Sequence, residues 1–132
     1  MHHEVIDLPH HAGQPRVALR AEVRVDGREL TVVTTHLQNE QRAARRQLDA
    51  LLHRLAAARP CVLLGDLNLR PEDIDERMRA AGFVLAGGGP TEPAWAPVQR
   101  IDHIAVAGFT ITDVTVGEAD VSDHRPLLAA LS

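Results

Sequence analysis

The sequence predicts an α/β fold in which a mixed, largely antiparallel sheet carries helices on one face. Three patterns support this prediction. Strand-like alternation of apolar and polar residues fills the first third of the chain, amphipathic helical runs occupy the middle, and short apolar runs return near the end. Hairpin signals at both ends, with a helical crossover between them, are typical of a mixed sheet.

The first third of the chain predicts strands joined by a tight turn. Residues 4–8 are expected to form a short strand, and residues 16–25 alternate apolar and charged side chains, the pattern of a half-buried strand. Asp26–Arg28 supplies an Asp-Gly hairpin turn, in which glycine adopts positive φ. Residues 29–36 return as a strand rich in β-branched side chains. We therefore expect the two longer strands to pair antiparallel.

The middle of the chain predicts a helix followed by a buried strand. The helix is expected over 40–58, with Asn39 as its N-cap and Glu40 in its first turn. The all-apolar run that begins at Cys61 then predicts a buried strand over 61–65. Apolar residues at helical spacing mark the buried face of the helix: Leu48, Leu51, Leu52 and Leu55.

The rest of the chain predicts a second helix and further strands. Pro71 is suited to open a helix over 72–81, and Gly82 is well placed to end it. A short strand and a long Gly/Pro-rich loop follow. Because the early strands are apolar on both faces, the sheet face opposite the helices needs cover as well. Three more strands are expected at the end of the chain, over 100–108, 109–116 and 126–131.

Composition narrows the possible functions. A length of 132 residues and a net charge of −4 suit a single domain over 1–132. Aromatic residues make up 2%, which together with the net acidity argues against an extended nucleic-acid surface. All 14 basic residues are arginines, whose planar guanidinium groups suit phosphate. Cys61 is the single cysteine and is predicted to be a buried, inert thiol. Without a membrane-length run or a signal-peptide pattern, a cytoplasmic location is expected.

Polar side chains follow one of the predicted strands directly. Asp66 and Asn68 stand two positions apart after the strand at 61–65. In extended backbone, residues i and i+2 point the same way, so both side chains are expected to face one spot. An ionised aspartate can accept a proton from water, and an asparagine can donate to a phosphate oxygen. The alternative, in which Asp66 belongs to a turn and Asn68 caps the next helix, remains open on this pattern alone.

Histidines and aspartates at other strand edges extend this set. His36 ends its strand, and Asp102 and His103 are neighbours in a later one. Alternation sends these two to opposite faces and places Asp102 on the core side, where a carboxylate needs a partner. His124, next to Asp123, can supply that partner, because an acid that orients an imidazole is a common catalytic device. The alternatives are polar strand ends and an ordinary Ser/Asp turn.

The order and spacing of these motifs resemble the second half of the endonuclease/exonuclease/phosphatase superfamily. That superfamily includes pancreatic deoxyribonucleases, inositol polyphosphate 5-phosphatases and bacterial sphingomyelinases. The resemblance runs through PRVALRAEV, THL, LLGDLN, AGF, RIDHI and SDHRPLLA, and so covers nearly the whole chain. It implies one lobe of a four-layer α/β/β/α sandwich and metal-dependent hydrolysis of phosphoesters.

The resemblance implies a role for each matching residue. His36 matches a histidine that contacts phosphate. Asp66 matches the acid that positions or deprotonates the attacking water, and Asn68 matches the amide that holds the phosphate. Asp102 matches the acid paired with the catalytic histidine, which is His124 here and which steadies charge on the phosphoryl group.

The resemblance also implies a divalent cofactor, Mg²⁺ or Mn²⁺. Asp123 matches an acid near the metal, and Asp66 is the second expected ligand. The cation would polarise the phosphoryl oxygen. Substrate contacts are expected from Asn68, from Arg100, and from Trp95 in the Gly/Pro-rich loop. The alternative for Trp95 is that it covers a sheet edge.

The sequence departs from the superfamily because the first-half motifs, including the glutamate that is the main metal ligand, are not found in it. Weak activity in isolation is therefore expected. Three interpretations stay open: a hydrolase completed by association, a non-catalytic module that binds a phosphorylated ligand or another chain, and a partial chain. The apolar sheet face predicts a partner, either a second copy or a separate chain carrying the first lobe. The substrate stays open among nucleic acid, inositol phosphate, lipid and other phosphoesters.

Overall fold

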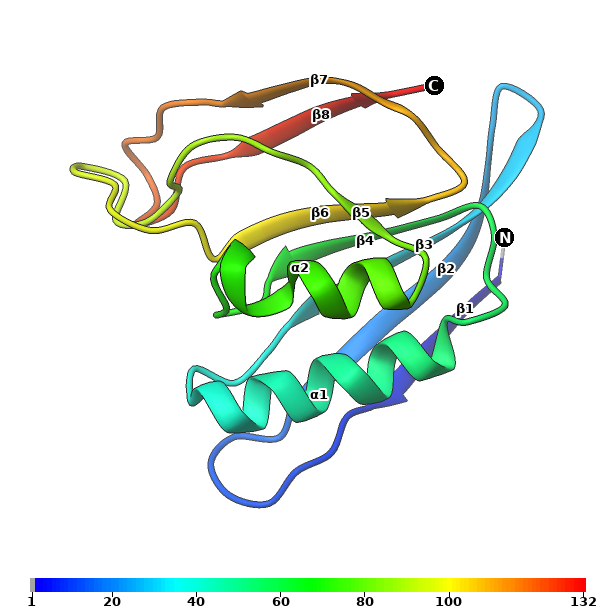
Figure 1. The fold of residues 1–132 in the computed structure, drawn as a ribbon, viewed down its shortest axis with the longest axis horizontal. Coiled ribbons are helices and arrows are strands. Elements are labelled where there is room, and N and C mark those ends of the chain that lie inside the picture. The colour runs from blue at the N-terminus through cyan, green and yellow to red at the C-terminus, as the bar shows by residue number, and fades with distance from the viewer. Residues whose placement is uncertain (1) are drawn as a thin grey trace.

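The computed structural model describes residues 2–132, whose strands form two sheets (Figure 1). The larger sheet has the strand order β1-β2-β3-β4-β6-β5, and β7 and β8 pair separately. Among these strands, β3 and β4 pair parallel and the other pairs are antiparallel. This arrangement confirms the predicted fold class. The elements are β1 His2–Asp7, β2 Val17–Val25, β3 Arg28–His36, α1 Gln41–Arg54, β4 Cys61–Asp66, α2 Pro71–Ala80, β5 Val84–Leu85, β6 Asp102–Ala107, β7 Ile111–Val116 and β8 Leu127–Leu131.

The turn between β2 and β3 has the predicted chemistry. Asp26 and Gly27 both have positive φ, at 48° and 80°. Two consecutive positive φ angles define the turn whose twist matches that of an antiparallel hairpin. Val25 therefore pairs with Arg28, and the register continues from there to Ala18 opposite Thr35.

The start of α1 differs from the prediction. Its N-cap is Glu40, whose carboxylate accepts the backbone N–H groups of Arg42 and Ala43 at 3.0 and 2.7 Å. The assignment of Asn39 as the cap was therefore wrong. The longer glutamate side chain reaches the free N–H groups of the first turn from one position further along the chain.

The helix ends follow local backbone chemistry. α1 ends at Arg54, earlier than predicted, because the chain tightens at Leu55, whose N–H donates to the carbonyls of both Leu51 and Leu52. α2 begins at Pro71, as predicted. Gly82 follows its end with φ of 83°, the left-handed conformation that glycine adopts without strain.

Both helices pack against one face of the six-stranded sheet and enclose the core. The predicted thiol at Cys61 is fully buried there, and burial raises its pKa to about 11. Within residues 2–132, neither helix has the length and apolar character needed to cross a membrane. Large, fully buried core side chains come from the helices, from β4 and from the turn after α2, among them Leu48, Leu51, Leu63, Ile74, Met78 and Phe83.

The other face of the six-stranded sheet is apolar as well, and only part of it is covered. Val5, Val17 and Leu19 on β1 and β2 are 62, 46 and 44% exposed. Toward the other edge of the same face, β8 contacts β6, and Val62 and Val106 are buried. Figure 1 shows β7 and β8 on the side of β6 away from α2. The expectation of one sheet with Val62 on its uncovered face was therefore wrong, because β7 and β8 begin a second layer.

Candidate active site

Three neighbouring strands place His36, Asp66 and Asp102 in one row across the sheet. His36 is the last residue of β3 and pairs with Asp66, the last residue of β4. Asp66 in turn pairs with Asp102, the first residue of β6. All three side chains point to the face opposite the helices, because residues in register on neighbouring strands share a face. We call these three residues the polar row.

Asp102 lies on a different face from the one expected. His103, its neighbour, points toward the helices, is 2% exposed, and lies with Nε2 2.6 Å from the carbonyl oxygen of Leu69. The helix-side core therefore lies under His103, and Asp102 faces the cavity that the polar row lines. The predicted alternation was right, but the sequence could not show which of the two faces the helices cover.

His124 reaches the polar row from the loop before β8. Its Nδ1 lies 2.6 Å from Oδ2 of Asp102, and Thr91 Oγ1 donates to the same oxygen at 2.7 Å. Its Nε2 lies 3.8 Å from Oδ2 of Asp66, so the ring bridges two carboxylates. Burial disfavours the charged ring, but the hydrogen bond to Asp102 and the surrounding negative charges outweigh burial and raise the pKa of His124.

Asp66 occupies the centre of the polar row. Burial raises the pKa of its carboxyl group, and the negative charge of Asp102 raises it further. The hydrogen bond from the N–H of Asn68, and to a smaller extent His36, whose Nε2 lies 3.3 Å from Asp66 Oδ2, partly offset these effects on the pKa. A carboxylate whose proton affinity is raised in this way is better suited to accept a proton from water near neutral pH.

Asn68 reaches the site through a turn rather than along a strand. Its φ is 53°, so the extended geometry expected for Asp66 and Asn68 was wrong. The N–H of Asn68 donates to Oδ1 of Asp66 at 3.0 Å, and its Nδ2 donates to the carbonyl of Leu37 at 2.8 Å. One amide N–H of the side chain stays available for a ligand. Asn68 does not cap α2, whose N-cap is Arg70.

Gly65 allows β3 and β4 to come together beside the site. Its φ is 147°, and a Cβ atom at this position would lie 2.0 Å from the carbonyl oxygen of Thr35. Non-bonded carbon and oxygen atoms cannot approach so closely. The glycine of the GDLN motif is therefore required by the backbone that holds His36 beside Asp66.

The polar row and His124 line an open cavity of about 550 Å³, to which Asn68 and Asp123 also contribute. Sequence reasoning missed two of its lining residues. Arg16 lies at the start of β2, and within residues 2–132 its buried Nε has no hydrogen-bond partner. Asn39 was assigned to the helix cap. The available signal was position alone, because Arg16 begins the strand predicted over 16–25 and Asn39 follows the strand predicted over 29–36.

Two predicted substrate contacts lie away from this cavity. Arg100 donates from Nη1 to the carbonyl of Ala86 at 2.8 Å and lines a neighbouring cavity instead. Burial lowers the pKa of its guanidinium group. Trp95 is 76% exposed and is not among the residues that line this cavity. The Gly/Pro-rich loop contributes Thr91, which sequence reasoning did not single out, through its hydrogen bond to Asp102.

The donor set suits a divalent cation that keeps part of its water shell. Ligand atoms of Asp66, Asp102 and His124 lie within 4.8 Å of one another. Thr91 and His124 already occupy Oδ2 of Asp102, which leaves Asp66 and the nearby Asp123 as the freer carboxylates. Mg²⁺ and Mn²⁺ favour carboxylate oxygens, and Mg²⁺ commonly binds through one or two carboxylates plus water.

Comparison with known proteins identifies the family. The sequence model of the Endonuclease/Exonuclease/phosphatase family matches residues 4–124, which include the polar row and His124. The chain belongs to the endonuclease/exonuclease/phosphatase family. This confirms the resemblance noted from the GDLN and SDHRP motifs, and the fold agrees with it.

Relatives within the family are longer than this chain. A UPF0294 protein from Vibrio vulnificus is 27% identical over 131 residues, which cover 89% of this chain and 45% of that protein. The chain thus spans less than half the length of this curated relative. The endonuclease/exonuclease/phosphatase from Beutenbergia cavernae has a TM-score of 0.83 at 23% identity, covering 99% of this chain and 44% of that one.

A phosphatase of known specificity shares the fold at greater distance. The mannosyl-6-phosphatase from Bacteroides thetaiotaomicron has a TM-score of 0.78 at 16% identity and covers 99% of this chain and 66% of that one. At this identity the likeness establishes the fold alone.

Proposed function

We propose that this chain carries the polar row and catalytic histidine of a metal-dependent phosphoester hydrolase. The single observation that carries the proposal is the Asp102–His124–Asp66 arrangement, in which one imidazole lies 2.6 Å from one carboxylate oxygen and 3.8 Å from another. Family membership and the phosphatase neighbour support it. Arrangements of paired carboxylates around a histidine are suited to proton transfer and to stabilising negative charge.

The residues divide the hydrolytic step between them. Asp66 accepts a proton as water attacks phosphorus, the new P–O bond forms, and the bond to the leaving oxygen breaks. His124, held by Asp102, stabilises negative charge on the phosphoryl oxygens. The free amide N–H of Asn68 and the guanidinium of Arg16 bind those oxygens. The leaving oxygen takes up a proton from solvent.

A divalent cation completes the proposed chemistry. Asp66 and Asp123 would hold it, and when bound it would neutralise charge on the phosphoryl group. This set contains no counterpart of the family's main glutamate ligand. The cation is therefore expected to bind weakly, and turnover by this chain alone is expected to be low.

A phosphodiesterase assay tests the proposal. The 132-residue chain is expected to hydrolyse bis(p-nitrophenyl) phosphate slowly with Mg²⁺ or Mn²⁺ and not at all after chelation with EDTA. A slow, metal-dependent rate whose value per protein chain rises with protein concentration would support completion of the site by association. No turnover with either metal at any protein concentration would overturn the proposal in favour of a module that binds a phosphorylated ligand or a partner chain.

We further propose that the uncovered sheet face binds a second copy of this chain, in the cytoplasm. Val5, Val17 and Leu19 lie on this face and are all more than two-fifths exposed. Burying apolar surface contributes roughly 25 cal/mol per Å², so a second chain that packs against this exposed apolar face would stabilise the fold. A separate chain that carries the first lobe is the other possible occupant.

Light scattering distinguishes these occupants. The wild-type chain is expected to behave as a dimer at micromolar concentration, and Leu19→Asp is expected to shift it to monomer, because a carboxylate cannot be buried unpaired. Leu128→Asp is the matched control, since Leu128 is 56% exposed on β8. A wild-type chain that stays monomeric at micromolar concentrations would contradict the second-copy proposal and favour a separate partner.

A further inference from the structure

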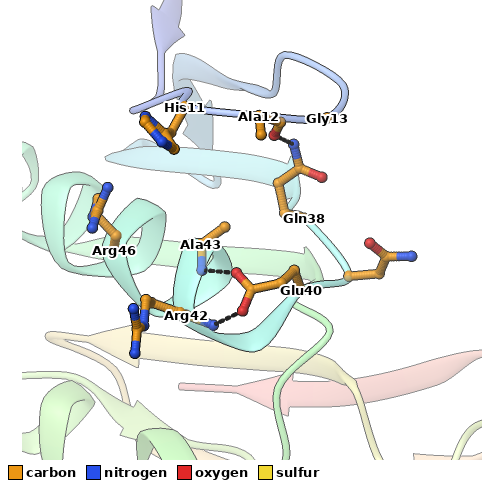
Figure 2. A pocket seen from close by; sticks show the side chains of 9 residues that line it. His11, Ala12, Gly13, Gln38, Glu40, Arg42, Ala43 and Arg46 are labelled. Carbon is orange, nitrogen blue, oxygen red and sulfur yellow. Dashed lines mark hydrogen bonds between the residues drawn. The ribbon is translucent and has the colours of Figure 1, made fainter.

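A second cavity lies directly beside the candidate active site. It has a volume of about 490 Å³ and is formed between the loop at 8–16 and the first turns of α1 (Figure 2). Asn39 lines both this cavity and the candidate active site. The two cavities therefore share this residue as part of their walls. The lining residues of the second cavity are His11, Ala12, Gly13, Gln38, Asn39, Glu40, Arg42, Ala43 and Arg46.

Two arginines of α1 line this cavity. Arg42 and Arg46 stand four residues apart on α1 and so share one side of the helix. In Figure 2, His11 reaches from the loop toward that side of α1. Within residues 2–132, neither arginine forms an ion pair, whereas Arg45 between them is paired with Asp73. These two guanidinium groups are therefore free to bind an anion.

The one acidic residue of the lining does not neutralise both arginines. The Glu40 carboxylate accepts the backbone N–H groups of Arg42 and Ala43 at the end of α1 (Figure 2). Its two oxygens are thus held against the backbone. The two arginines and one glutamate of the lining sum to one net positive charge.

Buried glutamines fix the wall of the cavity. Gln47 is 1% exposed, accepts the backbone N–H of Gln38 at 3.0 Å, and donates to the carbonyl of Pro9 at 3.1 Å. Gln38 is 6% exposed and donates to the carbonyls of Ala12 and Gln14. Buried side-chain amides that form hydrogen bonds to the backbone of one loop hold that loop in a single arrangement. Buried amides therefore hold the backbone that frames the cavity, whereas the arginine side chains that line it are exposed.

We propose that this cavity is a second phosphate subsite of the proposed hydrolase. It rests on the proposed function, and it narrows the substrate to molecules that carry a second phosphate group beyond the one that is cleaved. Arg42 and Arg46 bind that second phosphate, since planar guanidinium groups match phosphate oxygens in pairs. Asn39 marks the path between the two groups. A short oligonucleotide and a small bisphosphorylated molecule both present this chemistry.

NMR titration with inorganic phosphate tests the two sites separately. Phosphate is expected to shift the amide signals of Gly13 and Ala43 at the second cavity and those of Asn68 and His124 at the candidate active site. The double variant Arg42→Gln, Arg46→Gln is expected to lose the shifts at Gly13 and Ala43. A second double variant, Arg24→Gln with Arg79→Gln, removes the same charge elsewhere and is the matched control.

The pattern of shifts separates the two proposals. Shifts at Asn68 and His124 without shifts at Gly13 and Ala43 would overturn the subsite and leave the proposed function standing. Shifts at Gly13 and Ala43 that survive the Arg42 and Arg46 substitutions would also overturn it. Absence of shifts at Asn68 and His124, together with absence of turnover, would count against the proposed function itself.

Kinetics then identify the source of the second phosphate. With Mn²⁺, wild-type KM is expected to be on the order of tenfold lower for thymidine 3′-(p-nitrophenyl phosphate) carrying a 5′-phosphate than for the same compound without it. The Arg42→Gln, Arg46→Gln variant loses this preference, and the Arg24→Gln, Arg79→Gln control keeps it.

Competition by 5′-phosphorylated dithymidylate but not by fructose 1,6-bisphosphate indicates a nucleotide source, and the reverse indicates a small bisphosphate. An equal wild-type KM for both compounds, with no competition, overturns the proposal.

Discussion

Asp66→Asn is expected to lower phosphodiester turnover by about a thousandfold, within the range by which general acid–base groups contribute to catalysis. The substitution keeps the shape of the side chain and an oxygen for the N–H of Asn68. It removes the carboxylate that is proposed to accept the proton of an attacking water. The measurement is release of p-nitrophenolate from bis(p-nitrophenyl) phosphate with Mn²⁺.

Asp113→Asn is the control for this experiment. Asp113 lies exposed on β7, away from the candidate active site, and the substitution makes the same change of charge. Its turnover is expected to equal that of the wild-type chain. If Asp66→Asn retained more than about a tenth of wild-type turnover, Asp66 would not be the proton acceptor, because even weak general-base catalysis is worth more than this.

Gly65→Ala is expected to destabilise the fold by on the order of 3 kcal/mol, since it adds a steric clash to a backbone conformation that few residues adopt. The added Cβ would lie 2.0 Å from the carbonyl oxygen of Thr35, in the backbone of the neighbouring strand. Neither strand can move away without breaking the pairing that aligns the polar row. Urea unfolding followed by circular dichroism measures the loss as a lower midpoint.

Gly27→Ala separates the clash from the backbone strain. Gly27 also has positive φ, but a Cβ atom there would meet no atom within 4 Å. Its substitution is expected to cost about 1 kcal/mol, the usual penalty for a side chain at such a position. Equal losses for the two variants would show that the contact with Thr35 does not constrain the site.

Local patterns in the sequence predicted much of the fold. Alternation along 17–25 and the Asp-Gly turn were sufficient for β2 and β3, because side-chain period and turn chemistry act over a few residues. Leu48, Leu51 and Leu52 marked the buried face of α1 in the same way. The family motifs also contained every residue of the polar row, together with His124.

The remaining features depend on contacts between distant segments. The register that puts His36 beside Asp66 is set only after the chain has crossed over through α1, and no local pattern encodes it. The separate β7–β8 sheet and the approach of Thr91 to Asp102 are of the same kind. Asn68 was misplaced for a different reason, since its left-handed backbone breaks the rule of alternation on which the prediction relied.

The polar row also determines which length changes this chain can tolerate. Its three side chains share a face only while β3, β4 and β6 keep their registers, and a shift of one residue would turn a side chain toward the helices. Insertions and deletions within these strands therefore remove the site at a single step, whereas loops that carry no site residue can change length at little cost. Divergence among family members is accordingly expected to accumulate in loops such as the one between β6 and β7, with strand lengths held constant.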